Sequence, residues 1–281
     1  FLFTDNHGAF ESKRVNQLKA GYVIGAGIET ALTNYLSLKA EYRLLYFDNT
    51  SADSMSEQDV HAQTFLNNVS LRTSLIQVGV NYHFNEQSFV NLYDDTVWQT
   101  EFGVRGFLSD GMTGAPQPLL NNTGSMLVSR LTYGDMQAIA EETFARIDHV
   151  SGIFVKGNLG AGSITHGQLI DEDFPAGDAY SNTSSSIEGN LSYATLDAGY
   201  SFIKTDAAKT GAFVGYQYYA QNIGAYGCSQ VAGSSICVPS REFNNVMAIA
   251  EEDTYRSLRL GLNSILQLTE NLSLNAEAAY V

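Results

Sequence analysis

The feature that most constrains this chain is an alternation of apolar and polar residues with a period of two, which returns along most of its length. Between Leu36 and Tyr46 the even positions are apolar or aromatic, whereas the odd positions include Lys39, Glu41 and Arg43. Successive side chains of a β-strand point to opposite faces, so this pattern predicts strands with one apolar and one charged face. The pattern returns at 22–28, 76–84, 153–161, 194–202, 258–268 and 272–280. We therefore expect an all-β, antiparallel protein.

The charges on the polar faces favour a transmembrane β-barrel over a soluble sandwich or soluble barrel. In a membrane barrel alternate residues face lipid while their neighbours face an enclosed lumen, and aromatic residues gather at the two membrane interfaces. Tyr residues cluster near the ends of several of these segments. The alternative from the residues alone is a soluble sheet whose apolar face covers a core.

Composition excludes one large class of partner. Fifteen Lys and Arg stand against thirty Asp and Glu, which gives a net charge of -15, whereas phosphate binding requires clustered cations. We therefore expect no nucleic-acid partner. No nucleotide-binding loop, serine-hydrolase motif or zinc-type Cys/His spacing occurs, so we expect neither a cofactor nor a metal.

Connections of two kinds predict which end of the barrel faces outward. Short turns at 33–34 and 269–271 contrast with long connections rich in Ser, Asn, Gly and Asp at 49–64, 109–123, 175–188 and 227–252. Bacterial outer-membrane barrels have short periplasmic turns and longer extracellular loops. The expected location is the bacterial outer membrane, with the long loops extracellular.

Both cysteines, Cys228 and Cys237, fall in one of these long connections. An oxidising periplasm or cell exterior favours a disulfide between them. A metal site is the alternative, but two thiols without a nearby His supply half of a zinc shell.

From residue 97 onward the chain resembles the omptin family of outer-membrane endopeptidases. The matching segments are 129–133 (SRLTY), 169–174 (LIDEDF), 191–194 (LSYA) and 215–217 (GYQ). The resemblance implies a ten-stranded barrel that projects beyond the membrane, with residues 97–281 as its strands one to seven.

Residues 1–84 resemble the remaining part of such a barrel. Residues 66–84 end in Val78, Val80, Tyr82 and Phe84, like the closing strand of outer-membrane barrels, and 21–48 resemble the closing hairpin of small α-proteobacterial OmpA-type porin-like barrels. We interpret 1–84 as an outer loop plus three closing strands, 85–96 as a linker joining the usual C- and N-termini, and the whole as one circularly permuted barrel. A segment of a tandem array, or an error of tracing or numbering, would produce the same order.

The omptin resemblance implies a water-activating site of two residue pairs at the barrel mouth. Asp171 and Asp173 match the first pair, and Asp5 and His7 match the second. Residues two apart in a strand project from one face, so each pair can converge on a point. In this hypothesis the two aspartates bind and polarise water while His7, oriented by Asp5, acts as general base on a polypeptide substrate.

Strand parity places a condition on that hypothesis. Extrapolation from Ile153 and Val155 places Asp171 and Asp173 on the outer face, unless a β-bulge near Gly167 resets the alternation. The predicted site therefore depends on such a bulge.

Two departures from the omptin pattern limit what the resemblance implies. Phe3 stands where omptins carry an acidic residue that helps select basic substrates, so dibasic specificity is not implied. Of the family's lipopolysaccharide-binding triplet only a Tyr is kept, at Tyr216, because Tyr218 and Ala220 occupy the other two positions. Outer-membrane lipid and lipopolysaccharide are the expected surroundings, without lipid-dependent activation.

The competing class is a non-catalytic barrel that is structural, adhesive or narrowly porin-like. Ten strands enclose a lumen that charged side chains can largely fill, so we do not expect a wide channel. The side chains proposed to fill it are Lys39, Glu41, Arg43, Glu101, Arg105, Arg259 and Glu277. The adjacent Asp148 and His149 are expected on opposite faces, with a lumen or turn role, and the sequence specifies no oligomeric state.

Overall fold

The computed structural model describes the backbone of residues 2–4, 10–12, 20–55, 64–84, 97–121, 124–174, 180–233, 237 and 245–281. Side chains are described for 20–47, 71–84, 97–112, 130–174, 180–233, 237 and 245–281. Regular structure in these ranges is entirely β-strand. Across the described ranges, no helix has the length and apolar character needed to cross a membrane.

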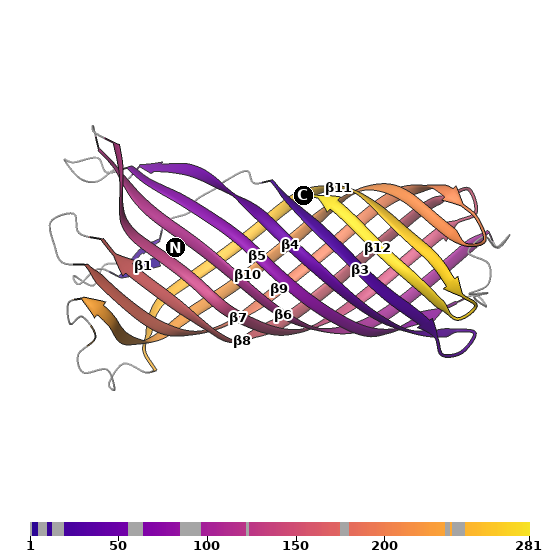
Figure 1. Cartoon of the computed structure of the whole chain (residues 1–281), viewed down its shortest axis with the longest axis horizontal. Coiled ribbons are helices and arrows are strands. Elements are labelled where there is room, and N and C mark those ends of the chain that lie inside the picture. The colour runs from indigo at the N-terminus through magenta and orange to yellow at the C-terminus, as the bar shows by residue number, and fades with distance from the viewer. Residues whose placement is uncertain are drawn as a thin grey trace.

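Within the described residues, ten antiparallel strands close into a ring (Figure 1). Each of β3 to β11 pairs with the next strand along the chain, and β12 pairs with β3. The all-β fold class and the strand count predicted from the sequence are therefore confirmed. The bounds are β3 Gly21–Ala31, β4 Leu36–Met55, β5 Thr64–His83, β6 Trp98–Asn121, β7 Gly124–His149, β8 Ile153–Asp173, β9 Ser181–Lys204, β10 Ala208–Gly233, β11 Met247–Thr269 and β12 Leu272–Tyr280.

The ring closes where β12, the last strand, pairs with β3. β12 pairs with β3 from Leu272 opposite Thr30 to Tyr280 opposite Tyr22. The pairing ends at Gly21, whose N–H donates to the Val281 carbonyl at 2.7 Å while the Val281 N–H donates back at 2.9 Å. A circular permutation and a segment of a tandem array both fit this pairing, so the division into 1–84, 85–96 and 97–281 stays a prediction.

Two short strands lie outside the ring. β1 (Leu2–Thr4) pairs with β11, with Leu2 opposite Ala250, and β2 (Phe10–Ser12) pairs with β1. The segment that begins at residue 2 therefore runs beside β11 at the end of the barrel marked by N in Figure 1.

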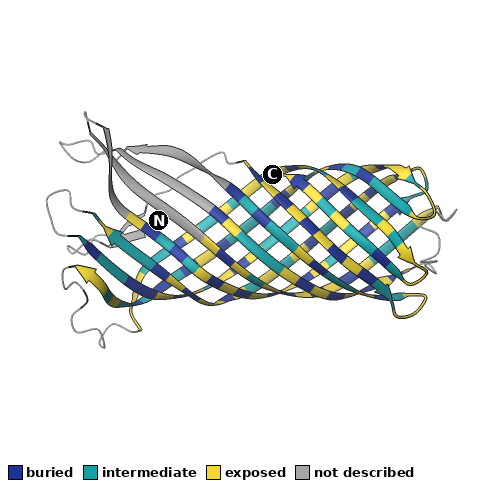
Figure 2. Cartoon of the chain, in the orientation of Figure 1, coloured by how far each residue is buried: buried dark blue, intermediate teal, exposed yellow. Residues whose placement is uncertain are grey.

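Burial alternates along the strands as the sequence predicted (Figure 2). In β3 the odd residues Gly21 to Glu29 are buried, and the even residues between them, including Ile24 and Ile28, are exposed. Apolar side chains face outward on the other strands as well, among them Val104, Leu196 and Leu260. The seven charged side chains expected in the lumen are all buried or partly buried. A barrel with apolar residues outside and charges inside suits lipid around it.

Aromatic side chains gather at the end of the barrel with the short turns, called here the short-turn end. Tyr82 stacks on Tyr35 with ring centroids 6.3 Å apart and meets Phe84 edge-on at 5.1 Å. Trp98 lies 4.5 Å from the His149 ring. Amphipathic rings at this level fit one of the two interfacial girdles of a membrane barrel.

At the opposite end, called here the long-loop end, the predicted loop bounds are wrong. β6 continues to Asn121, β9 begins at Ser181, β10 continues to Gly233 and β11 begins at Met247, so much of 109–123, 175–188 and 227–252 is strand. In the same way β4 and β5 occupy parts of 49–64. Beyond the outward apolar band the outer faces of these strands are polar, so the composition there does not distinguish a strand from a loop.

Candidate functional site

A β-bulge in β8 turns the predicted aspartates toward the lumen. Below the bulge the even residues are buried, as at Phe154, and the register with β9 then shifts between Ile164 and Gln168. Gly167 within this shift has φ +155°, and beyond it the odd residue Leu169 is buried. The bulge that the hypothesis required is therefore present, and Asp171 and Asp173 continue the inward face of Leu169.

The partner strand β7 changes face at the same height. Its even residues are buried up to Met136, and its odd residues Leu131 and Tyr133 are buried beyond Asp135, which has φ +51°. The β7–β8 register shifts between Gly134 and Ala138, alongside the bulge of β8. Both strands thus change which residues face the lumen, and the inward residues Leu131, Tyr133 and Leu169 beyond the bulges join Met136 and Ile164 below them in one buried apolar cluster.

Asp171 lies at the edge of this apolar cluster. It stands directly opposite Leu131 in the β7–β8 pairing. Burial, with the charges of Asp173 and Glu172, raises the pKa of Asp171 to about 6. Asp173 is exposed. The intervening Glu172 pairs on the other face with Arg130, 2.5 Å away.

A second pair of carboxylates, which sequence analysis missed, lies on β11. Glu251 is 2% exposed, and it shares a strand face with Asp253, two residues on. Burial and the charge of Asp253 raise the pKa of Glu251 well above the ordinary range. The Gln221 amide donates to Asp253 at 2.9 Å, and the Tyr219 hydroxyl donates to Gln221 at 3.0 Å. The alternation of Glu251 and Asp253 was the available signal, but residues up to 252 were interpreted as loop.

Tyr133 connects the two acidic pairs electrostatically. Burial raises the pKa of Tyr133, and the charges of Glu251, Asp253 and Asp171 raise it further. Three strands separate β7 from β11 around the ring, so Tyr133 and Glu251 approach each other across the lumen. We call Asp171, Asp173, Glu251 and Asp253 together the acidic mouth.

Asp5 and His7 lie outside the described residues, so their predicted roles stay predictions. In the sequence they follow β1, whose Leu2 pairs with Ala250, the residue before Glu251. The predicted disulfide between Cys228 and Cys237 is present, with the two Cα atoms 5.5 Å apart.

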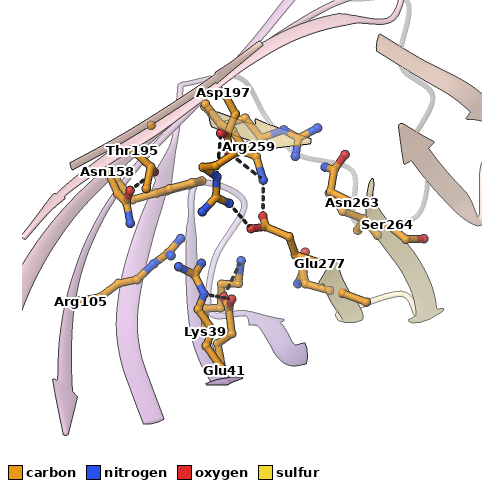
Figure 3. Close-up of a pocket in the computed structure, with 18 residues that line it drawn as sticks. Lys39, Glu41, Arg105, Asn158, Thr195, Asp197, Arg259, Asn263, Ser264 and Glu277 are labelled. Atoms are coloured by element: carbon orange, nitrogen blue, oxygen red, sulfur yellow. Dashed lines mark hydrogen bonds and ion pairs between the residues drawn. The ribbon is translucent and has the colours of Figure 1, made fainter. Parts of the chain in front are cut away.

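Midway along the barrel an ion-pair network crosses the lumen (Figure 3). The Arg259 guanidinium donates to Asp197 at 3.0 Å and to Glu277 at 2.7 Å, and Lys156 pairs with the same two carboxylates. A cavity of about 70 Å³ remains among the residues that line this region. That space holds only a few water molecules.

The structure also shows where Asp148, His149 and Tyr216 lie. Asp148 faces the lumen, where it pairs with Arg146 at 2.6 Å and Lys209 at 2.7 Å. His149 lies on the other face against Trp98, as expected for adjacent strand residues. Tyr216 faces outward and is 47% exposed.

Comparisons with known proteins give matches among solved structures alone. A scan against protein-family models found no match, and a search of curated proteins found none either. Among solved structures, the outer membrane protease OmpT from Escherichia coli matches with a TM-score of 0.37 and 8% identity, over 93% of each chain. A match at that TM-score and identity assigns no activity, and the barrel is defined here by its own strand pairing.

Proposed function

We propose that this chain is an integral outer-membrane β-barrel whose short-turn end faces the periplasm and whose long-loop end faces the cell exterior. The outward apolar band and the aromatic side chains at its short-turn border support the membrane location. The long strands β7 to β11 continue past this band, where their outer faces become polar. Lipopolysaccharide and other outer-membrane lipids are the proposed surroundings of Tyr216 and its outward neighbours.

We further propose that the acidic mouth is the water-activating site of an omptin-like surface endopeptidase. Asp171 and Asp173 would hold and polarise a water molecule, and His7, oriented by Asp5, would remove its proton. The observation that carries this proposal is the bulge at Ile164–Gln168, because it directs both aspartates toward the lumen.

The surroundings of Asp171 suit this chemistry. Its pKa of about 6 leaves the carboxylate mostly ionised at pH 7, so it can accept a hydrogen bond from water. The apolar neighbours Leu131 and Leu169 limit the competing bulk water, which strengthens electrostatic effects on a bound water molecule. β1, which precedes Asp5 and His7 in the sequence, pairs with β11 at Ala250, next to Glu251 of the acidic mouth.

Peptide cleavage by the detergent-folded full chain tests the proposal. A mixed peptide library is the suitable substrate, because Phe3 gives no reason to expect a dibasic preference. We expect Asp171→Asn, Asp173→Asn and His7→Ala to lower the rate by about 10²–10⁴-fold, which is the usual contribution of a positioned acid or base.

Glu172→Gln is the matched control, because Glu172 neighbours both aspartates but faces outward toward Arg130. Its cleavage rate should match that of the unchanged chain. Cleavage that persists in Asp173→Asn and His7→Ala alike would reject the assignment of these residues.

The second candidate function is a non-catalytic structural or adhesive barrel. It is favoured by the filling of the lumen, by the ion-pair network at mid-height and by the buried apolar cluster near the mouth. A folded sample that cleaves no peptide and adds no conductance to a bilayer would support this function instead.

A further inference from the structure

A cluster of metal-binding side chains lies at the short-turn end of the lumen, far along the barrel from the acidic mouth. Glu29 of β3, His83 of β5 and Glu101 of β6 each offer a ligand atom, and these atoms lie within 4.8 Å of one another. A single ion can therefore contact all three side chains after small rotations. None of the three takes part in the chemistry proposed at the mouth.

Strand register explains why three residues from distant parts of the sequence meet. His83 and Glu101 stand directly opposite each other in the β5–β6 pairing. Ser37 stands opposite Asn81, and Glu29 opposite Lys39, in the neighbouring pairings. Residues of this parity face the lumen in β3, β4, β5 and β6, so four adjacent strands present one concave polar surface.

Neighbouring polar side chains hold two of the three ligands in position. Oε1 of Glu29 accepts hydrogen bonds from the Ser37 hydroxyl and, at 3.0 Å, from the Asn81 amide. Nε2 of His83 lies 3.0 Å from the Ser37 hydroxyl and 3.5 Å from Oε1 of Glu29. Outer hydrogen bonds of this kind fix the orientation of carboxylate and imidazole ligands in metal sites.

A separate observation points to a cation as the ligand of this cluster. Oε1 of Glu101 is buried and has no hydrogen-bond partner among the described residues. A buried carboxylate oxygen without a hydrogen-bond donor is costly, and Glu29 brings a second carboxylate close to it. The Lys39 ammonium, which is opposite Glu29 in the pairing, lies 3.4 Å from a different carboxylate, that of Glu41.

We propose that Glu29, His83 and Glu101 bind a divalent transition-metal ion of the Zn²⁺ type. One imidazole nitrogen with two carboxylates is a donor set that Zn²⁺ accepts, and a water molecule would complete four-coordination. The ion would connect β3, β5 and β6, and thereby join the two strands on either side of residues 85–96. The site is structural and independent of any activity at the mouth.

Zn²⁺ binding to the metal-stripped, detergent-folded full chain tests this proposal. We expect one Zn²⁺ per chain by equilibrium dialysis, and a rise in the temperature of unfolding when Zn²⁺ is added. Co²⁺ in place of Zn²⁺ should give the visible absorption of a four- or five-coordinate site. His83→Ala and Glu101→Gln should each weaken binding by at least about 100-fold, and Ser37→Ala by about 10- to 100-fold, because Ser37 only orients the ligands.

His149→Ala is the matched control, since His149 lies at the same end but faces outward against Trp98. This variant should keep both the stoichiometry and the affinity. Because Glu101→Gln preserves the shape of the side chain, it serves where His83→Ala fails to fold. Absence of stoichiometric binding to the unchanged chain, or binding that survives in Glu101→Gln, would overturn the proposal, whether or not the chain cleaves peptides.

Discussion

Replacement of Arg259 by Met is the sharpest test of the view that charges packed in the lumen hold this barrel together. The guanidinium has three acceptors in the described lumen, namely Asp197 at 3.0 Å, Glu277 at 2.7 Å and the Gln217 side-chain oxygen at 2.9 Å. The Arg259 and Asp197 side chains are 5% and 3% exposed. Solvent therefore screens this ion pair little, and breaking it leaves buried charge uncompensated.

The magnitude follows from the charges of the cluster. Arg259 and Lys156 carry two positive charges against the two negative charges of Asp197 and Glu277, so the four groups sum to zero. Arg259→Met leaves a net charge of -1 among buried groups. Removal of one partner of a buried pair costs about 3–5 kcal/mol. Asp197→Asn together with Arg259→Met restores neutrality, so the double variant should be more stable than the Arg259→Met variant.

Urea unfolding of the barrel in detergent micelles measures both free energies. Trp98 is the single tryptophan, so its fluorescence reports the transition without a second signal. The cycle of the two single variants and the double variant should give a coupling of about 2 kcal/mol or more. Arg130→Met is the matched control, because its pair with Glu172 is an exposed one, with the Arg130 side chain 44% exposed, and should cost at most about 1 kcal/mol. An additive cycle, or equal costs for Arg259→Met and Arg130→Met, would refute the reasoning.

Three further expectations concern the mouth and the lumen. The pKa of Asp171 is raised from 3.8 to about 6, so between these two pH values the folded state keeps a proton that the unfolded state has lost. The free energy of unfolding should therefore fall as the pH rises through this window. Asp171→Asn should remove that part of the fall when urea midpoints are compared at pH 4 to 7. Gly167→Ala should lower the free energy of unfolding by about 1–3 kcal/mol and reduce peptide cleavage, because the φ of +155° at Gly167 disfavours a side chain and the new Cβ would meet Ile187. Gly106→Ala is the control, since a Cβ there meets nothing within 4 Å, and it should change neither stability nor cleavage. Planar bilayers containing the unchanged chain should show no stepwise conductance, because the ion-pair network and the apolar cluster occupy the described lumen; single-channel steps would contradict this filling.

The sequence predicted most of the membrane-level architecture because one physical rule governs it. Wherever lipid lies outside and an enclosed lumen inside, alternate residues must be apolar, so Lys39, Glu41 and Arg43 could be assigned to the lumen from parity alone. The ten-strand count came instead from the resemblance to omptins, and the expected oxidising location suggested the Cys228–Cys237 disulfide.

The same rule stops applying beyond the lipid, which explains the errors at the long-loop end. Strand residues there, such as those of β9 from Ser181 onward, have water on the outside and resemble loops in composition. Glu251 and Asp253 lie within or beside a segment that was interpreted as a loop. The approach of Glu251 to Tyr133 across the lumen depends on the strand register, which no local sequence pattern specifies. The cluster of Glu29, His83 and Glu101 was also missed because its formation depends on strand register, which brings together residues far apart in the sequence.

The bulges in β7 and β8 lie between the part of each strand with an apolar outer face and the part with a polar outer face. Below them the even residues face inward, among them Met136 and Ile164, and above them the odd residues Leu131, Tyr133 and Leu169 face inward while Arg130 and Glu172 face outward. A strand that leaves lipid for water must exchange its faces in this way if it is to bury apolar residues on both sides of the interface, and inserting one residue achieves the exchange without ending the strand. Asp171 comes just after this change of face, at a depth where burial raises its pKa but water still has access. The position of the candidate site thus depends on this change of face, because a regular β8 of the same sequence without the bulge would carry both aspartates on its outer face.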